Sequence, residues 1–159
     1  MVKTIAKTKK EKELIEEYYS DIDIDEVRKE FLEDYKITPE DLDFEFDERT
    51  ILFKYQENTK YFYMFNDIYQ KEKSVLVQLI DNYKKLLGVK YDSYRFNSEK
   101  DLKKTEIENY YLPKDEDVIA MGILIKKQEI RVNFIELICK TFEKQQWNMK
   151  SYKEILYNK

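Results

Sequence analysis

Residues 41–47 carry the pattern that most constrains the fold, a strict alternation of acidic and apolar side chains. Successive side chains of an extended strand point to opposite faces, so a period of two predicts a strand with one wet face. Neighbouring carboxylates on that face would lie about 6.5–7 Å apart. The apolar positions are Leu42, Phe44 and Phe46, and the acidic ones are Asp41, Asp43, Glu45 and Asp47.

Two further segments resemble strands because they are dense in aromatic and β-branched residues. They are residues 50–56 and 61–66, and polar stretches at 47–49 and 57–60 would form the turns before them. Short links of this kind predict an antiparallel meander. Residues 89–96 could add a fourth strand.

Apolar residues at helical spacing predict helices on both sides of this sheet. Thr38-Pro39 predicts at most one helical turn before the first strand, Gly88 is placed to cap the 71–87 helix, and Pro113 breaks the chain. Residues 113–128 fit either a helix or a buried strand. The predicted helices cover about residues 8–19, 23–35, 71–87, 98–110, 129–145 and 151–157. We therefore expect one α+β domain over residues 1–159, a three- to four-stranded antiparallel sheet packed against several helices, with residues 1–10 frayed.

The composition excludes several classes of chemistry. The chain has no histidine, one cysteine and two isolated glycines. It therefore lacks a Ser-His-Asp triad, a histidine zinc ligand, an internal disulfide and a glycine-rich phosphate loop. We expect no catalytic residue, no metal and no cofactor.

The apolar runs are too short to cross a membrane: the longest, residues 118–125, has eight residues, against the roughly 18 that a span requires. The lysines near the start are not followed by the apolar stretch of a signal peptide. A single free thiol suits a reducing compartment. We expect a cytoplasmic protein of a bacterial host, without a membrane partner.

Residues 21–48 concentrate the negative charge. They hold 13 carboxylates and three basic residues, a local charge of −10 in a chain whose net charge is −4. Like charges spaced three or four residues apart on a helix repel one another and cost stability. One row of them would follow the face of the 23–35 helix opposite its apolar side. This row is Asp23, Glu26, Glu30, Glu33 and Asp34.

Three interpretations of the two acidic rows remain open. They could be a solvated face that keeps the chain soluble, or a surface that binds a basic groove, with carboxylates in place of nucleic-acid phosphates. They could also include a divalent-metal site of a nuclease, built from Asp21, Asp23 and Asp25. Such a site needs carboxylates that converge from separate elements, whereas alternating residues on one short segment diverge.

Aromatic residues and lysines offer alternative surfaces. Tyr61 and Tyr63 could stack nucleic-acid bases, but this region has only Lys54 and Lys60 nearby, so packing or a protein interface is favoured. A small DNA-binding regulator could instead use the lysine-rich termini, with a helix-turn-helix whose turn falls at Trp147. Direct DNA binding is not the interpretation we favour.

The acidic stretch 21–48, together with the aromatic segment 61–65, resembles the anti-CRISPR proteins of phages and mobile elements that block type II (Cas9) effectors. This resemblance implies a non-catalytic protein that binds a host defence nuclease with a basic surface, and possibly its guide RNA. It would block nucleic-acid binding or the movement of a nuclease domain. The implied contact residues are the two acidic rows with Tyr61 and Tyr63.

Overall fold

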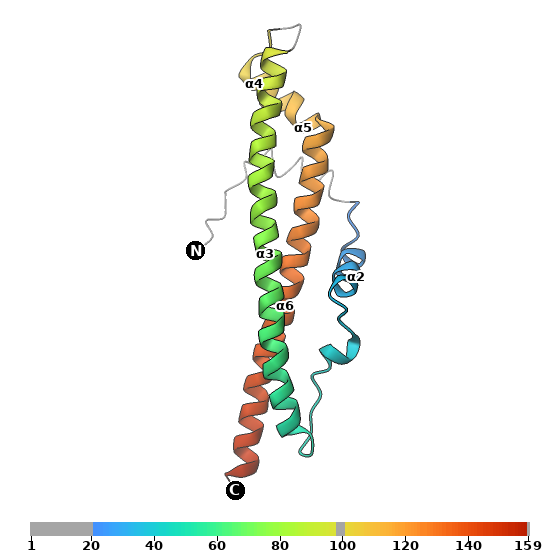
Figure 1. Ribbon diagram of the computed structural model, residues 1–159, viewed down its shortest axis with the longest axis vertical. Helices are drawn as coiled ribbons and strands as arrows, with labels where there is room; N and C mark the ends of the chain where they lie inside the picture. The colour runs from blue at the N-terminus through green and yellow to red at the C-terminus, as the bar shows by residue number, and fades with distance from the viewer. Residues whose placement is uncertain (1–20, 98–100, 159) are drawn as a thin grey trace. The chain divides into compact units, whose positions relative to one another are not determined.

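The computed structural model describes residues 21–97 and 101–158, and within them every regular element is a helix (Figure 1). The long elements are α2 (Ile24–Asp34), α3 (Ile51–Phe96) and α6 (Glu116–Tyr157). The short ones are a 3₁₀ helix η1 (Pro39–Leu42), α4 (Lys104–Glu106), a π-helical turn η2 (Ile107–Tyr111) and α5 (Leu112–Lys114). The described part contains no strand, so the α+β class and its antiparallel sheet are wrong, and the fold is all-α.

Several predicted helices are confirmed within this architecture. The amphipathic 23–35 segment is α2, and Thr38-Pro39 opens a single 3₁₀ turn closed by a capping box between Thr38 and Asp41. The 71–87 and 129–145 segments lie inside α3 and α6. The predicted helix at 8–19 and the frayed start lie outside the described residues.

Three of the predicted strands lie within α3, in which buried positions recur every seven residues. Its buried positions include Ile51, Asn58, Phe65 and Glu72, each seven after the last, which keeps one face of the helix against a neighbour. The strand-like segments 50–56, 61–66 and 89–96 are parts of this one helix. Gly88 does not end it, since the helix runs on to Phe96 without a positive φ at any glycine.

α6 likewise unites segments that the sequence analysis separated. Its buried residues Val118, Ile125, Val132 and Cys139 also recur every seven positions. Residues 116–128 are therefore helical, and Pro113 lies in the first turn of α5, where proline is tolerated. The predicted turn at Trp147 is also helical, so the chain has no helix-turn-helix there.

The described residues divide into two compact units, and both α3 and α6 contribute to each. Unit 1 contains residues 21–23 and 76–128 where described, and unit 2 contains 24–75 and 129–158. In unit 1 the buried apolar side chains are Ile107, Leu112, Val118 and Ile125. Whether residues 1–159 behave as one domain stays a prediction.

Unit 2 is built on antiparallel packing of α3 against α6. Phe65 stacks on Phe142 with ring centroids 4.9 Å apart, and Asn58 donates from Nδ2 to the Phe142 carbonyl and to Gln146 Oε1. α2 packs on both helices by burying Phe31 completely. The core cluster is Phe31, Ile37, Phe65, Ile68, Ile135, Ile138, Cys139 and Phe142.

α2 ends in a Schellman motif that directs the chain back onto this core. The Ile37 amide donates to the Leu32 carbonyl and the Lys36 amide to the Glu33 carbonyl, which are the two bonds of that motif. Lys36 takes the left-handed conformation with φ 52°, where glycine is usual. The turn places Ile37 in the core cluster.

The segment after η1 keeps the alternation of inner and outer side chains without forming a strand. Phe44 packs edge-on against Phe142, and Phe46 packs against Tyr152 of α6. Asp43 and Glu45 between them are exposed. The period of two therefore does separate an inner from an outer side, but the segment crosses helices and has no neighbouring strand to pair with.

Candidate functional site

The predicted helix row lies on α2 and remains exposed. Glu26, Glu30, Glu33 and Asp34 are all exposed residues of that helix, whereas Asp23 precedes it and belongs to unit 1. The row therefore contributes four carboxylates, not five, to one surface of unit 2. Asp34 is also held by an internal ion pair, described below.

The predicted strand row is largely engaged in local contacts. Asp41 accepts hydrogen bonds from the Thr38 amide at 2.8 Å and from the Tyr61 hydroxyl at 3.0 Å, and the pKa of its carboxyl is lowered, first by the Thr38 amide. Asp47 accepts from the Thr50 amide, which likewise lowers its pKa and closes the turn before α3. These two carboxylates stabilise the local backbone, and their role in partner contact stays a prediction.

Asp43 and Glu45 lie between these two carboxylates and are exposed. Asp43 accepts from the Glu45 amide and pairs with Lys54 at 3.7 Å, while half of its side chain remains exposed. We use the term acidic surface for the exposed carboxylates of unit 2 that belonged to the two predicted rows, leaving out Asp47, which is exposed but accepts hydrogen bonds in the turn before α3. They are Glu26, Glu30, Glu33, Asp34, Asp43 and Glu45.

The two predicted tyrosines have different surroundings. Tyr61 is half-buried, stacks on Phe65 and Phe142, and donates to Asp41, so it belongs to the core. The Asp41 hydrogen bond, followed by burial, raises the pKa of the Tyr61 hydroxyl. Tyr63 points away from that core and is 66% exposed. Of the two tyrosines, Tyr63 therefore presents the larger surface to a partner.

Tyr63 lines an open pocket of about 270 Å³ in unit 2 that the sequence analysis did not find. Trp147, 64% exposed, faces the same space from α6. We use the term aromatic pocket for this hollow. Its lining residues are Tyr55, Thr59, Phe62, Tyr63, Glu143, Gln146, Trp147 and Lys150.

Lysines of α6 lie directly on these rings. The Lys150 ammonium is 5.4 Å from the centre of the Trp147 ring, and the Lys153 ammonium is 5.5 Å from that of Tyr55. Both distances are within the range of cation–π attraction. The sequence around the aromatic segment has few basic residues, and the antiparallel return of α6 supplies them from about 90 positions away.

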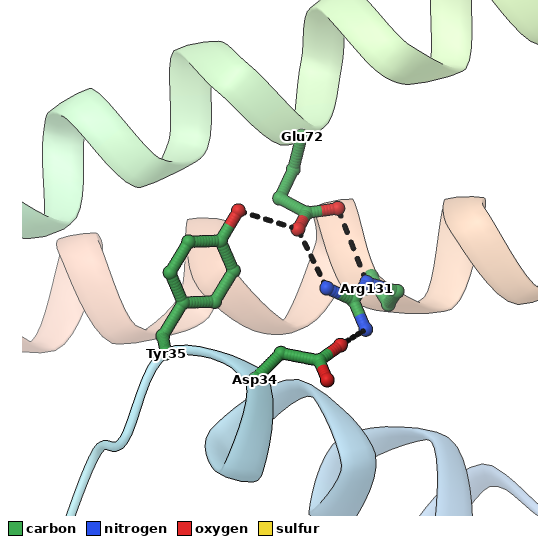
Figure 2. A network of polar contacts seen from close by, with 4 residues as sticks. All are labelled: Asp34, Tyr35, Glu72 and Arg131. Carbon is green, nitrogen blue, oxygen red and sulfur yellow. Dashed lines mark hydrogen bonds and ion pairs between the residues drawn. The ribbon is translucent and has the colours of Figure 1, made fainter.

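A buried charge network joins α2, α3 and α6 in the middle of unit 2 (Figure 2). Arg131 of α6 donates through Nε and Nη2 to both oxygens of Glu72 on α3, at 3.1 and 2.7 Å, and through Nη1 to Asp34 of α2 at 2.8 Å. Tyr35 donates to Glu72 at 2.8 Å. The Glu72 side chain is only 5% exposed. The network therefore connects three elements through one guanidinium.

The network also perturbs its titrating groups. Burial opposes the charge of Arg131, but Glu72 and Asp34 outweigh it and raise the pKa of the guanidinium. Burial, followed by the hydrogen bond to Glu72, raises the pKa of Tyr35 to about 12. Arg131 stays charged and Tyr35 stays neutral at physiological pH. The network therefore has a structural role, since it ties α2, α3 and α6 together through Arg131.

Unit 1 has a smaller polar cluster at the start of α6. Asp115 accepts from the amides of Asp117 and Val118 and from the Tyr94 hydroxyl at 2.6 Å, and Lys90 pairs with it at 3.4 Å. Burial alone would raise the pKa of Asp115, but Tyr94, the Val118 amide and Lys90 together lower it. Asp115 is thus a helix cap for α6.

The described residues do not include a candidate metal centre. Among residues 21–97 and 101–158, no three histidine, cysteine or acidic side chains converge closely enough to hold an ion. The metal site proposed at Asp21, Asp23 and Asp25 gains no support from these residues. The described helices also include none with the length and apolar character of a membrane span.

Comparisons with protein-family models, with curated protein sequences and with solved structures find no match to this chain.

Proposed function

We propose that this chain is a non-catalytic binding protein that docks its acidic surface onto the basic groove of a nucleic-acid-processing protein. The partner class we favour is a host defence nuclease of the type II CRISPR kind, bound alone or with its guide RNA, in the host cytoplasm. One observation carries the proposal: Glu30 and Glu33 are exposed on an ordered helix, one turn apart. Fixed carboxylates complement a surface built to bind phosphates and accelerate association.

The test compares two pairs of exposed carboxylates. Glu30→Gln with Glu33→Gln removes two charges from the acidic surface, while Asp81→Asn with Asp92→Asn removes two from exposed positions of α3 in unit 1. Neither pair includes a carboxylate that the fold uses as a cap or in the Arg131 network.

The purified chain is titrated into a guide-loaded nuclease while target cleavage and binding rates are measured. We expect inhibition, with the α2 pair slowing association about tenfold at low salt and the control pair leaving it unchanged. Absence of inhibition, or equal loss from both pairs, would contradict the proposal.

The aromatic pocket favours a second candidate function, binding of single-stranded nucleic acid. Exposed Tyr63 and Trp147 offer faces on which bases can stack, and Lys150 and Lys153 lie within reach of phosphates. Stacking on such platforms contributes about 1–3 kcal/mol per base. The net negative charge of the chain opposes this function, so it ranks second.

Trp147 is the only tryptophan of the chain and reports directly on this pocket. Titration with an oligothymidylate should quench its fluorescence if the second candidate holds. Tyr63→Ala should then weaken binding tenfold or more, while Phe96→Ala, which removes an exposed aromatic ring of unit 1, should not. Unchanged fluorescence at low salt would eliminate this candidate.

A further inference from the structure

We propose that residues 24–50, comprising α2, η1 and the segment that follows, form a releasable cover over the α3/α6 face of unit 2, with Arg131 as its latch. The cover opens as a unit while α3 and α6 remain helical. This device is separate from the proposed function, which concerns only the outer surface of the cover.

The cover depends on its contacts with α3 and α6. α2 has 11 residues, fewer than the roughly 12–15 at which an isolated helix becomes even marginally stable in water. Beyond η1, residues 43–46 contain no regular element. The carboxylates of the cover outnumber its basic residues 11 to four, so they repel one another, and docking must overcome that repulsion.

The surface beneath the cover is unusually polar at its centre. Arg131 and Glu72 form a bidentate pair there, and the cover buries it with Asp34 at the end of α2 and with Tyr35, the residue that follows. Burying an ion pair costs desolvation energy that an all-apolar contact would not. Opening the cover returns water to both charges, while their mutual bond stays intact because both partners belong to α3 and α6. The core thus retains its ion pair when the cover opens.

Arg131 holds the cover through one bond in particular. Its Nη1 atom donates to Asp34 at 2.8 Å, and the Arg131 guanidinium carbon lies 5.1 Å from the centre of the Phe31 ring. The Asp34 side chain is 60% exposed, so this contact breaks without uncovering a buried carboxylate. Asp34 is therefore the accessible end of the latch.

Hydrogen exchange on the full-length chain, followed by mass spectrometry at neutral pH, tests the cover. We expect amides of residues 27–42 to exchange together and at least tenfold faster, relative to their intrinsic rates, than those of 58–72 and 132–146. Asp34→Asn should accelerate the first group about fivefold and leave the other two unchanged. Glu33→Gln is the matched control, since it removes an adjacent exposed charge of α2 and should not accelerate exchange.

Two outcomes would overturn the proposal. If the three groups exchange at one rate, or if Asp34→Asn accelerates all three equally, residues 24–50 belong to the same cooperative core as α3 and α6. If Glu33→Gln accelerates exchange as much as Asp34→Asn does, the effect comes from general charge and Arg131 is not a latch.

Discussion

At the scale of single residues, Arg131 and Glu72 have the largest predicted effect on stability. Arg131→Met leaves the Glu72 carboxylate buried and without its guanidinium, which costs about 3–5 kcal/mol. Urea unfolding followed by Trp147 fluorescence measures this loss in unit 2. Lys140→Met is the matched control, since its ion pair with Glu136 is largely exposed and should change stability by less than about 1 kcal/mol.

The double variant Arg131→Met with Glu72→Leu separates charge from packing. Replacing both members of a buried pair with apolar side chains is often neutral or stabilising, so most of the lost stability should return. If the double variant is as unstable as Arg131→Met alone, the network contributes through its connection to α2, and the uncompensated charge is not the cause.

The pH dependence of stability is dominated by two groups that are neutral in the folded chain and whose pKa values are strongly raised. Burial raises the pKa of Cys139 to about 11, and burial with the Glu72 bond raises that of Tyr35 to about 12. A raised folded pKa means that the stabilisation is complete below the unfolded value and is lost as the pH rises through the folded one.

Stability should therefore stay nearly flat from pH 6 to 8 in this histidine-free chain, and fall from about pH 9 towards 12. Urea midpoints measured at intervals over that range check the prediction. Tyr35→Phe should reduce the loss above pH 10, while the contributions of Cys139 and of tyrosines such as Tyr61, whose pKa is also raised, stay in place. A steep change between pH 6 and 8 would contradict it.

At the scale of elements, the continuity of α3 makes Gly88 a weak point. It lies inside the helix, where glycine costs about 0.5–1 kcal/mol relative to alanine, and a Cβ added there meets no atom within 4 Å. Gly88→Ala should stabilise the chain by about that amount in thermal unfolding followed by circular dichroism. Destabilisation would mean that the chain does turn at Gly88, as the sequence analysis predicted.

The helices differ in how well the sequence predicts them. α2 could be predicted because its apolar residues and its caps agree. α3 could not, because Tyr61, Phe62 and Tyr63 favour strands locally, and the seven-residue spacing of its buried face emerges only over several turns. Two of the positions at that spacing are Asn58 and Glu72, which concealed the repeat by being polar.

The candidate site was predicted only in part, for a related reason. The carboxylates of α2 were placed correctly on the outer face of a helix. The sequence predicts a strand that would expose Asp41 and Asp47 to a partner. The structure instead forms turns there, in which the two carboxylates accept hydrogen bonds from the Thr38 and Thr50 amides. The aromatic pocket combines Tyr63 with Trp147 across two helices, and such a pairing requires knowledge of their register.

At the scale of the whole molecule, the two units should differ in stability. Within the described residues, unit 1 buries four apolar side chains, and unit 2 has a cluster of eight together with its ion-pair network. We expect unit 1 to unfold first in urea. Circular dichroism, which senses helices in both units, should then change before Trp147 fluorescence, which senses unit 2. Coincident transitions would mean one cooperative unit.

The two polar layers of unit 2 restrict how the length of this chain can change. Asn58 meets Gln146 and Glu72 meets Arg131, so the layers are separated by 14 residues on α3 and by 15 on the antiparallel α6. A deletion of seven residues between the layers on α3 alone would separate one polar side chain from its partner and leave it buried. Insertions or deletions between the layers should therefore be tolerated only as whole heptads that occur in both helices together.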